Sequence, residues 1–274
     1  MMDTEKNGTL PVPPAAGRRP LLILLHGTRM NAAQWTGFDT ALADLADVIA
    51  LDLPGHGARS GEAFSLDAVV QDVERLLADA GTRPVMLAGY SLGGYAALCF
   101  AEKHPQKLAG LALIASAAEP FAAGAWLYRL LGSTWDFLVR HRIDWLERHW
   151  FARLADPALW AAIQAHGGNF GQIRAAWDEV IARCRAAQLR AVSCPVLVAG
   201  GSRDQLHLHA QRFAAAAPCG KVVTVPGRSH LWPLTHPHEL KAVLRDWIGQ
   251  DVIPTGGASD ETAGTADRHG GAAT

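Results

Sequence analysis

The chain has 274 residues, 49% of them hydrophobic, and its 25 Lys and Arg residues nearly balance its 26 Asp and Glu residues. This length suits one large α/β domain with an insertion, and balanced charge without a long single-sign block argues against a nucleic-acid or polybasic membrane partner. The four cysteines lack Cys-x-x-Cys or zinc-type spacing, which favours free thiols over a disulfide framework or a metal site.

Residues 1–20 are polar and then Pro-rich. They contain no apolar stretch of the length found in a secretory signal or a membrane span. We therefore expect a flexible N-terminal segment and a cytoplasmic protein.

Short apolar runs, each bounded by Gly, Pro or Asp, recur along the chain and predict strands. They cover residues 21–25, 48–51, 85–88, 108–114, 196–199 and 222–225. Runs without polar alternation are typical of strands buried on both faces of a parallel sheet. Between them, residues 65–80 and 240–247 place apolar side chains at helical spacing, with Ser65 as an N-cap. This alternation predicts an α/β fold with a doubly wound, mostly parallel sheet.

The third run leads into Gly89-Tyr90-Ser91-Leu92-Gly93, and a helix-forming stretch follows. Gly-x-Ser-x-Gly between a strand and a helix has the form of a nucleophile elbow, a sharp turn that exposes the serine hydroxyl. Leu92 opens the helix, so its free N–H and the positive end of the helix dipole point to where an oxyanion would form. An ordinary Gly-rich turn is the alternative interpretation.

Residues 119–190 interrupt the alternation because they contain no strand-like run and hold most of the tryptophans. A helical insertion between parallel strands belongs at their carboxyl ends, so we expect a cap at 119–190 over a core formed by 21–118 and 191–249. Trp126 and Trp150 are the candidates from this segment for an apolar pocket. Packing between cap helices is the simpler explanation for any single tryptophan. Residues 250–274, rich in Gly, Ala, Thr and Ser, predict a disordered tail.

Taken together, the motifs resemble those of the α/β-hydrolase family, in its serine-hydrolase branch with a helical cap. The resemblance covers about residues 21–248 and rests on motifs that each follow a predicted strand: His26-Gly27, the run from Asp52 to Gly57, the elbow at Ser91, Asp204 and His230. The short segment before the first strand leaves little room for the antiparallel strand pair that many members carry. We therefore expect six main strands.

The resemblance implies that Ser91 is the nucleophile, His230 the base and Asp204 the carboxylate that orients it, in the chain order of this fold. A serine hydroxyl needs a positioned imidazole to take its proton and pass it to the leaving group. Asp204 has a second interpretation, as a turn residue that caps the next helix, and Glu119 is then the reserve acid.

The resemblance also assigns the second oxyanion donor to the backbone N–H of Thr28, with Arg29 as the runner-up. The Arg29 guanidinium could bind a substrate anion, although a solvent-facing or paired side chain is the simpler interpretation. Tyr90 and Trp232 are further candidates for the pocket, and His26 and Asp52 are expected to hold loops in place.

These features predict a serine hydrolase that cleaves a small-molecule carboxylic ester, with an apolar acyl or alcohol part, through an acyl-enzyme. We expect no metal or organic cofactor and a monomer or homodimer. A C–C bond hydrolase or lyase is the enzymatic alternative, and a ligand-binding receptor with vestigial hydrolysis is the alternative from another class, since one fold hosts many functions.

Overall fold

The computed structural model describes residues 19–119, 122–141, 145–167 and 172–253. Within these residues, six strands form one sheet in the order β2-β1-β3-β4-β5-β6, and neighbouring strands run parallel. The strands are β1 (Leu21–Leu25), β2 (Asp47–Leu51), β3 (Val85–Tyr90), β4 (Gly110–Ile114), β5 (Val196–Gly201) and β6 (Gly220–Val225). The four inner strands are wholly buried, as their uninterrupted apolar runs predict, while β2 and β6 are partly exposed at the edges. The expected doubly wound parallel sheet is confirmed.

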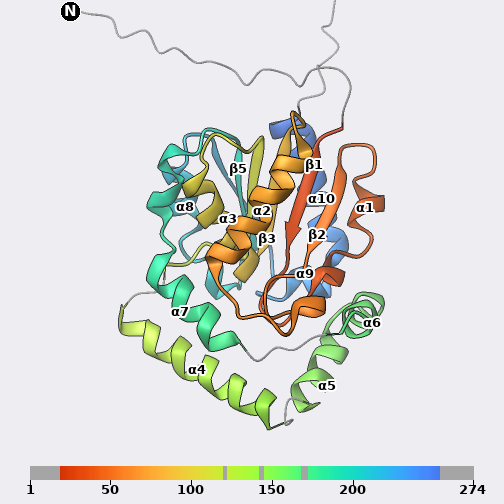
Figure 1. The fold of residues 1–274 in the computed structure, drawn as a ribbon, viewed down its shortest axis with the longest axis vertical. Coiled ribbons are helices and arrows are strands. Elements are labelled where there is room, and N and C mark those ends of the chain that lie inside the picture. Colours follow the sequence, from red (N-terminus) through yellow and green to blue (C-terminus); the bar gives the residue numbers. More distant parts are fainter. Residues whose placement is uncertain (1–18, 120–121, 142–144, 168–171, 254–274) are drawn as a thin grey trace, which may run out of the picture.

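Helices cover both faces of the sheet (Figure 1). One face packs against α2 (Leu66–Ala80), α3 (Leu92–Lys103) and α8 (Ala210–Ala216). The other packs against α1 (Phe38–Ala41), α9 (Trp232–Thr235) and α10 (Pro237–Trp247). The predicted N-cap is present, because the Ala68 N–H donates to Ser65 Oγ at 3.0 Å. Short 3₁₀ helices lie at η1 (Ala32–Trp35), η2 (Gly57–Arg59), η3 (Ala186–Ala191) and η4 (Gln205–His207).

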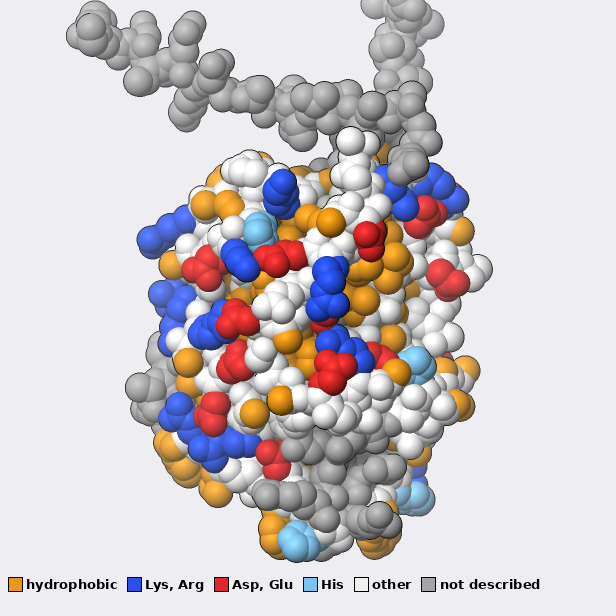
Figure 2. All heavy atoms as spheres, in the orientation of Figure 1, with side chains coloured by type: hydrophobic (Ala, Val, Ile, Leu, Met, Phe, Trp, Pro, Cys, Tyr) orange, Lys and Arg blue, Asp and Glu red, His pale blue; other side chains and the backbone are white. Residues whose placement is uncertain are grey.

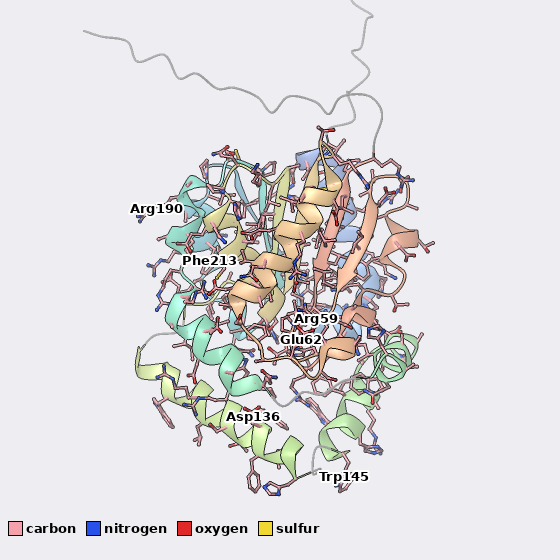
Figure 3. The ribbon with its side chains drawn as sticks, in the orientation of Figure 1. Arg59, Glu62, Asp136, Trp145, Arg190 and Phe213 are labelled. Carbon is pink, nitrogen blue, oxygen red and sulfur yellow. The ribbon has the colours of Figure 1, made fainter. Side chains whose placement is uncertain are left out.

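The chain between β4 and β5 forms the helical insertion, which lies beyond one end of the sheet (Figure 1). Its helices are α4 (Ala122–Arg140), α5 (Trp145–Leu154), α6 (Pro157–Ala165) and α7 (Ile173–Arg183). Asp136 on α4 (Figure 3) is buried and accepts the N–H groups of Ile173 and Arg174 at 2.9 and 3.2 Å, so it caps the first turn of α7. We call α4–α7 the cap helices. The domain limits expected from the sequence stay predictions.

Residues 1–18 and 254–274 lie outside the described residues, so the predictions of a flexible N-terminus and a disordered tail stay open there. The described structure continues through residue 253, past the expected start of the tail at 250. A π-helical turn, η5 (Ile248–Val252), continues α10, and the side chains of Val252 and Ile253 pack against the core. Asp251 also forms an ion pair of 2.8 Å with Lys221 on β6. These apolar and charged contacts hold the chain beyond residue 250.

The surface carries charges of both signs. Figure 2 shows Lys and Arg side chains interspersed with Asp and Glu over one face of the molecule. This pattern agrees with the near-neutral net charge of the chain. Within the described residues, no helix combines the length and the hydropathy needed to cross a membrane.

Candidate active site

Ser91 lies in the turn between β3 and α3 with a backbone φ of +52°. An L-residue is strained in this region, so the surrounding structure must hold it there. Gly89 and Gly93 allow the turn: a Cβ on Gly93 would lie 2.3 Å from the Leu25 carbonyl oxygen, and one on Gly89 would lie 2.2 Å from the Gly93 carbonyl oxygen. The local structure is therefore that of a nucleophile elbow.

His230 and Asp204 meet Ser91 at the carboxyl ends of the strands. His230 Nε2 lies 3.1 Å from Ser91 Oγ, and His230 Nδ1 lies 3.0 Å from Asp204 Oδ1. Asp204 follows β5, its carboxylate is fully buried, and the same Oδ1 accepts the Leu206 N–H at 2.8 Å. The Asp204 side chain therefore makes both contacts at once: it contacts His230, and it caps the helical turn that follows.

Tyr90 supports the loop that carries His230. Its hydroxyl donates to the His230 carbonyl oxygen at 3.0 Å, and the two rings stack with centroids 5.3 Å apart. Burial raises the pKa of the Tyr90 phenol, so the hydroxyl remains a hydrogen-bond donor at neutral pH. The hydrogen bond and the ring stacking together hold the His230 imidazole in place.

The loop after β1 faces the nucleophile. The Met30 N–H closes a turn onto the Gly27 carbonyl oxygen at 3.2 Å, and Arg29 at the third position of the turn has φ +68°. Thr28 on this turn and Leu92 at the start of α3 both line the cavity beside Ser91. Among the described residues, the backbone N–H groups of Thr28 and Leu92 donate to no other protein group. They are available to a ligand oxygen.

His26 and Asp52 hold this loop in place, as expected. His26 Nε2 accepts the Leu53 N–H at 2.9 Å, and burial lowers the pKa of His26 to about 3, so the ring is neutral. Asp52 accepts the N–H groups of Ala32 and Ala58 at 2.7 and 2.8 Å. Burial opposes ionisation of Asp52, but these hydrogen bonds outweigh it and lower the pKa of the carboxyl.

A cavity of about 400 Å³ lies over Ser91, between the core and the cap helices. Its lining is mostly apolar. The Arg29 guanidinium faces it, with its central carbon 4.7 Å from the Trp135 ring centroid and 5.5 Å from that of Phe151. The larger apolar side chains of the lining are Met30, Tyr90, Leu92, Tyr95, Leu131, Trp135, Phe151, Ile173, Trp177, Val180, Ile181, Leu206, Leu208 and Leu231.

Comparison with known proteins decides the family. The sequence model of the alpha/beta hydrolase family matches residues 22–243. This chain is an α/β hydrolase. A pimeloyl-[acyl-carrier protein] methyl ester esterase of Edwardsiella ictaluri is 30% identical over 252 residues, which cover 84% of this hydrolase and 93% of the relative.

Solved structures share the fold. MenH from S. aureus has a TM-score of 0.70 at 17% identity, over 88% of this chain and 97% of that one. A thermophilic esterase from Thermogutta terrifontis has a TM-score of 0.68 at 25% identity, over 86% of this chain and 92% of that one. The expected resemblance to the α/β-hydrolase family is confirmed.

The carboxylate of Glu119, the reserve candidate for the acid, makes its contacts with residues other than His230. Its Oε1 accepts the Ala186 N–H at 2.8 Å, and its Oε2 pairs with Arg212 at 2.9 Å. These contacts anchor the chain where it returns from α7 to the core. The carboxylate that contacts His230 belongs to Asp204.

The structure corrects three of the four predicted pocket residues. Tyr90 lines the cavity, but Trp126 and Trp150 do not, being 61% and 57% exposed. Trp232 is wholly buried in the core on the far side of the sheet from α3. The tryptophans that line the cavity are Trp135 and Trp177, which lie on the inner faces of α4 and α7. The sequence places tryptophans on both faces of the cap helices, and hydropathy alone does not distinguish the faces.

Proposed function

We propose that this hydrolase cleaves a carboxylic ester with an apolar acyl or alcohol part through an acyl-enzyme on Ser91. The observation that carries the proposal is the hydrogen-bonded chain from Asp204 through His230 to Ser91, at the wall of an apolar cavity. The Edwardsiella ictaluri relative, named as a methyl ester esterase, supports ester chemistry.

In the proposed mechanism, His230 Nε2 takes the Ser91 proton as Oγ attacks the ester carbonyl. Asp204 accepts the Nδ1–H, which keeps the imidazole in the productive tautomer and stabilises the imidazolium. The N–H groups of Leu92 and Thr28 donate to the developing oxyanion, with the N-terminus of α3 behind the first of them. His230 then protonates the departing alcohol. In the second half of the reaction His230 takes a proton from water as the water oxygen attacks the acyl carbonyl, and it returns that proton to Ser91 Oγ as the bond to the acyl group breaks and the acid leaves.

The cavity indicates the kind of substrate. Its apolar walls favour an aliphatic or aromatic group over a strongly polar one, because burial of apolar surface contributes roughly 25 cal/mol per Å². The polar atoms at the reaction centre belong to Ser91, His230 and the oxyanion loop. We therefore infer a small-molecule ester whose apolar part occupies the space between Ser91 and the cap helices.

The experiment that tests the proposal combines a substrate panel with active-site labelling. Nitrophenyl esters of increasing acyl length are assayed beside a vinylogous diketone, and a serine-directed phosphonate is mapped by mass spectrometry. We expect ester turnover, one equivalent of label on Ser91, and loss of nearly all turnover in a folded Ser91→Ala variant.

Other outcomes would replace the proposal. Preferred cleavage or elimination of the diketone indicates a C–C hydrolase or lyase, and tight binding without turnover indicates a receptor. Labelling at another residue, or an active Ser91→Ala enzyme, refutes the role of Ser91. The monomeric or dimeric state and the cytoplasmic location stay predictions from the sequence.

A further inference from the structure

Two buried cysteines far apart in the chain meet beside the elbow helix. Cys99 on α3 and Cys184 at the end of α7 are 85 positions apart, and their sulfurs lie 3.7 Å from each other. Cys184 Sγ also lies 3.9 Å from the Tyr95 carbonyl oxygen, one turn before Cys99 on α3. A disulfide bond is about 2.05 Å long. The sulfurs need to approach by roughly 1.7 Å, a shift that side-chain rotation and a small movement of α7 can supply.

The pair sits at the junction between the cap helices and the core. Cys184 ends α7, whose Trp177 and Ile181 line the cavity, and Cys99 belongs to the helix that begins at the elbow. Helices α3 and α7 contact each other here. The Arg185 side chain fixes the end of α7 by donating to the Ile181 and Cys184 carbonyl oxygens at 3.0 and 2.7 Å. A bond between the sulfurs would join two elements that are held side by side.

The surroundings favour Cys99 as the first sulfur to react. The hydrogen bond with Cys184 and the nearby Arg183 charge lower the pKa of the Cys99 thiol despite its burial. Three polar residues act on the Cys99 thiol: Glu102 and Arg183, which are exposed, and Gln188, which is partly exposed. Cys99 is 4% exposed and Cys184 is fully buried. Both cysteines belong to the core cluster, and Cys99, with its slight exposure and its polar neighbours Glu102 and Arg183, is the one that a small oxidant meets first.

We propose that Cys99 and Cys184 are a redox modification site, which a peroxide converts into a disulfide that ties α3 to the end of α7. The Cys99 thiolate attacks one oxygen of hydrogen peroxide; the O–O bond breaks, giving a sulfenic acid and, with a proton, one water. Cys184 sulfur then attacks the Cys99 sulfur; the S–O bond breaks, the S–S bond forms and a second water leaves. Two thiols and one peroxide give one disulfide and two waters. This inference does not depend on the proposed ester chemistry.

The test uses the full chain with the other two cysteines removed, Cys194→Ser and Cys219→Ser. This background keeps only the pair and eliminates the exposed Cys219, which would otherwise link two molecules. The folded, reduced protein is titrated with hydrogen peroxide, then denatured, alkylated and measured by intact mass and non-reducing peptide mapping. We expect both thiols to disappear together in a monomer, a linked Cys99–Cys184 peptide, and full reversal by dithiothreitol.

A matched variant separates the disulfide from other oxidation. With Cys184→Ala added, Cys99 should stop at a sulfenic acid that dimedone captures. Closing a loop of this length restricts the unfolded chain, so oxidation should raise the Tm of the pair-only protein by several degrees and leave the Cys184→Ala variant unshifted.

Two results overturn the inference. The first is the persistence of two free thiols in the pair-only protein at peroxide concentrations that fully oxidise Cys219 in the parent. The second is the conversion of Cys99 to sulfinic acid without a linked peptide. The linked peptide is read in a protein that retains both cysteines of the pair, so a poorly folding Cys184→Ala variant leaves the decision intact.

Discussion

Replacing Asp204 by Asn tests the charge behind His230 with little change of shape. The Leu206 N–H, 2.8 Å from Asp204 Oδ1, decides how the amide orients. It requires an acceptor, so the amide oxygen should keep this place and continue to accept from His230 Nδ1. The productive tautomer is then retained. What the variant loses is the negative charge that stabilises the imidazolium in the transition state.

The size of the loss follows from the geometry. Two unit charges 3.0 Å apart attract by about 5.5 kcal/mol at an effective dielectric constant of about 20. The amide dipole replaces part of this, which leaves a loss of about 3 to 5 kcal/mol. We therefore expect kcat to fall by roughly 10²- to 10⁴-fold with little change in KM. Asp204→Ala should cost more, because it also removes the acceptor that selects the tautomer.

The assay is steady-state hydrolysis of a short nitrophenyl ester, with folding checked by thermal melting. Glu119→Gln is the matched control, another buried carboxylate changed to an amide. It should reduce kcat by less than about tenfold, since Glu119 contacts Ala186 and Arg212 rather than His230. The reasoning is refuted if Glu119→Gln costs more than Asp204→Asn with both variants folded. It is also refuted, in its account of the tautomer, if Asp204→Asn is as inactive as Asp204→Ala.

Trp135→Ala should lower kcat/KM for a long-chain ester by about tenfold relative to an acetate ester, because it removes a wall of the cavity. Trp126 is exposed, so Trp126→Ala should change this ratio little, and equal ratios in the two variants would show that α4 does not set acyl-chain selectivity. Acid should destabilise the fold through His26. Its pKa of about 3 in the folded protein lies below the ordinary 6.5, so the stability that neutral His26 contributes is fully present above pH 6.5 and is lost as the pH falls from there toward 3. Urea unfolding should show about 2 kcal/mol less stability at pH 5.0 than at pH 7.5 from this group, and an unchanged slope in His26→Asn would assign the loss elsewhere. Gly93→Ala should destabilise the protein by about 3 kcal/mol or more, since its Cβ meets backbone oxygens, while Gly249→Ala, with open space around it, should melt like the parent.

Much of the fold follows from local patterns in the sequence. Strand β1 coincides with its apolar run, and α2 begins directly after the predicted cap Ser65. The meeting of Ser91, Asp204 and His230 could be anticipated for a topological reason: each follows a parallel strand, and the carboxyl ends of parallel strands share one edge. Spacing along the chain and the rules of sheet topology suffice for these features.

The remaining features depend on tertiary contacts that no local pattern encodes. Trp126 and Trp135 lie on the same helix, yet one faces solvent and the other the cavity, because the packing of α4 against α7 sets the rotation of α4. The contact between Cys99 and Cys184 arises only when α7 returns across α3. The extra turn after α10 depends on an apolar surface supplied by other elements.

The loop after β1 serves the cap as well as the nucleophile. Beside Thr28, the Arg29 guanidinium lies against rings from α4 and α5, and Asn31 Nδ2 donates to the Ile163 and Gly167 carbonyl oxygens at the end of α6, at 2.9 and 2.7 Å. Cap and loop are therefore not interchangeable parts. In a chimera that grafts a relative's cap onto this core, Arg29 and Asn31 lose their partners, and the loop that carries Thr28 shifts with them. Engineers who recombine such enzymes should transfer residues 28–31 together with the cap, because a change in the cap also changes the contacts of the loop beside Ser91.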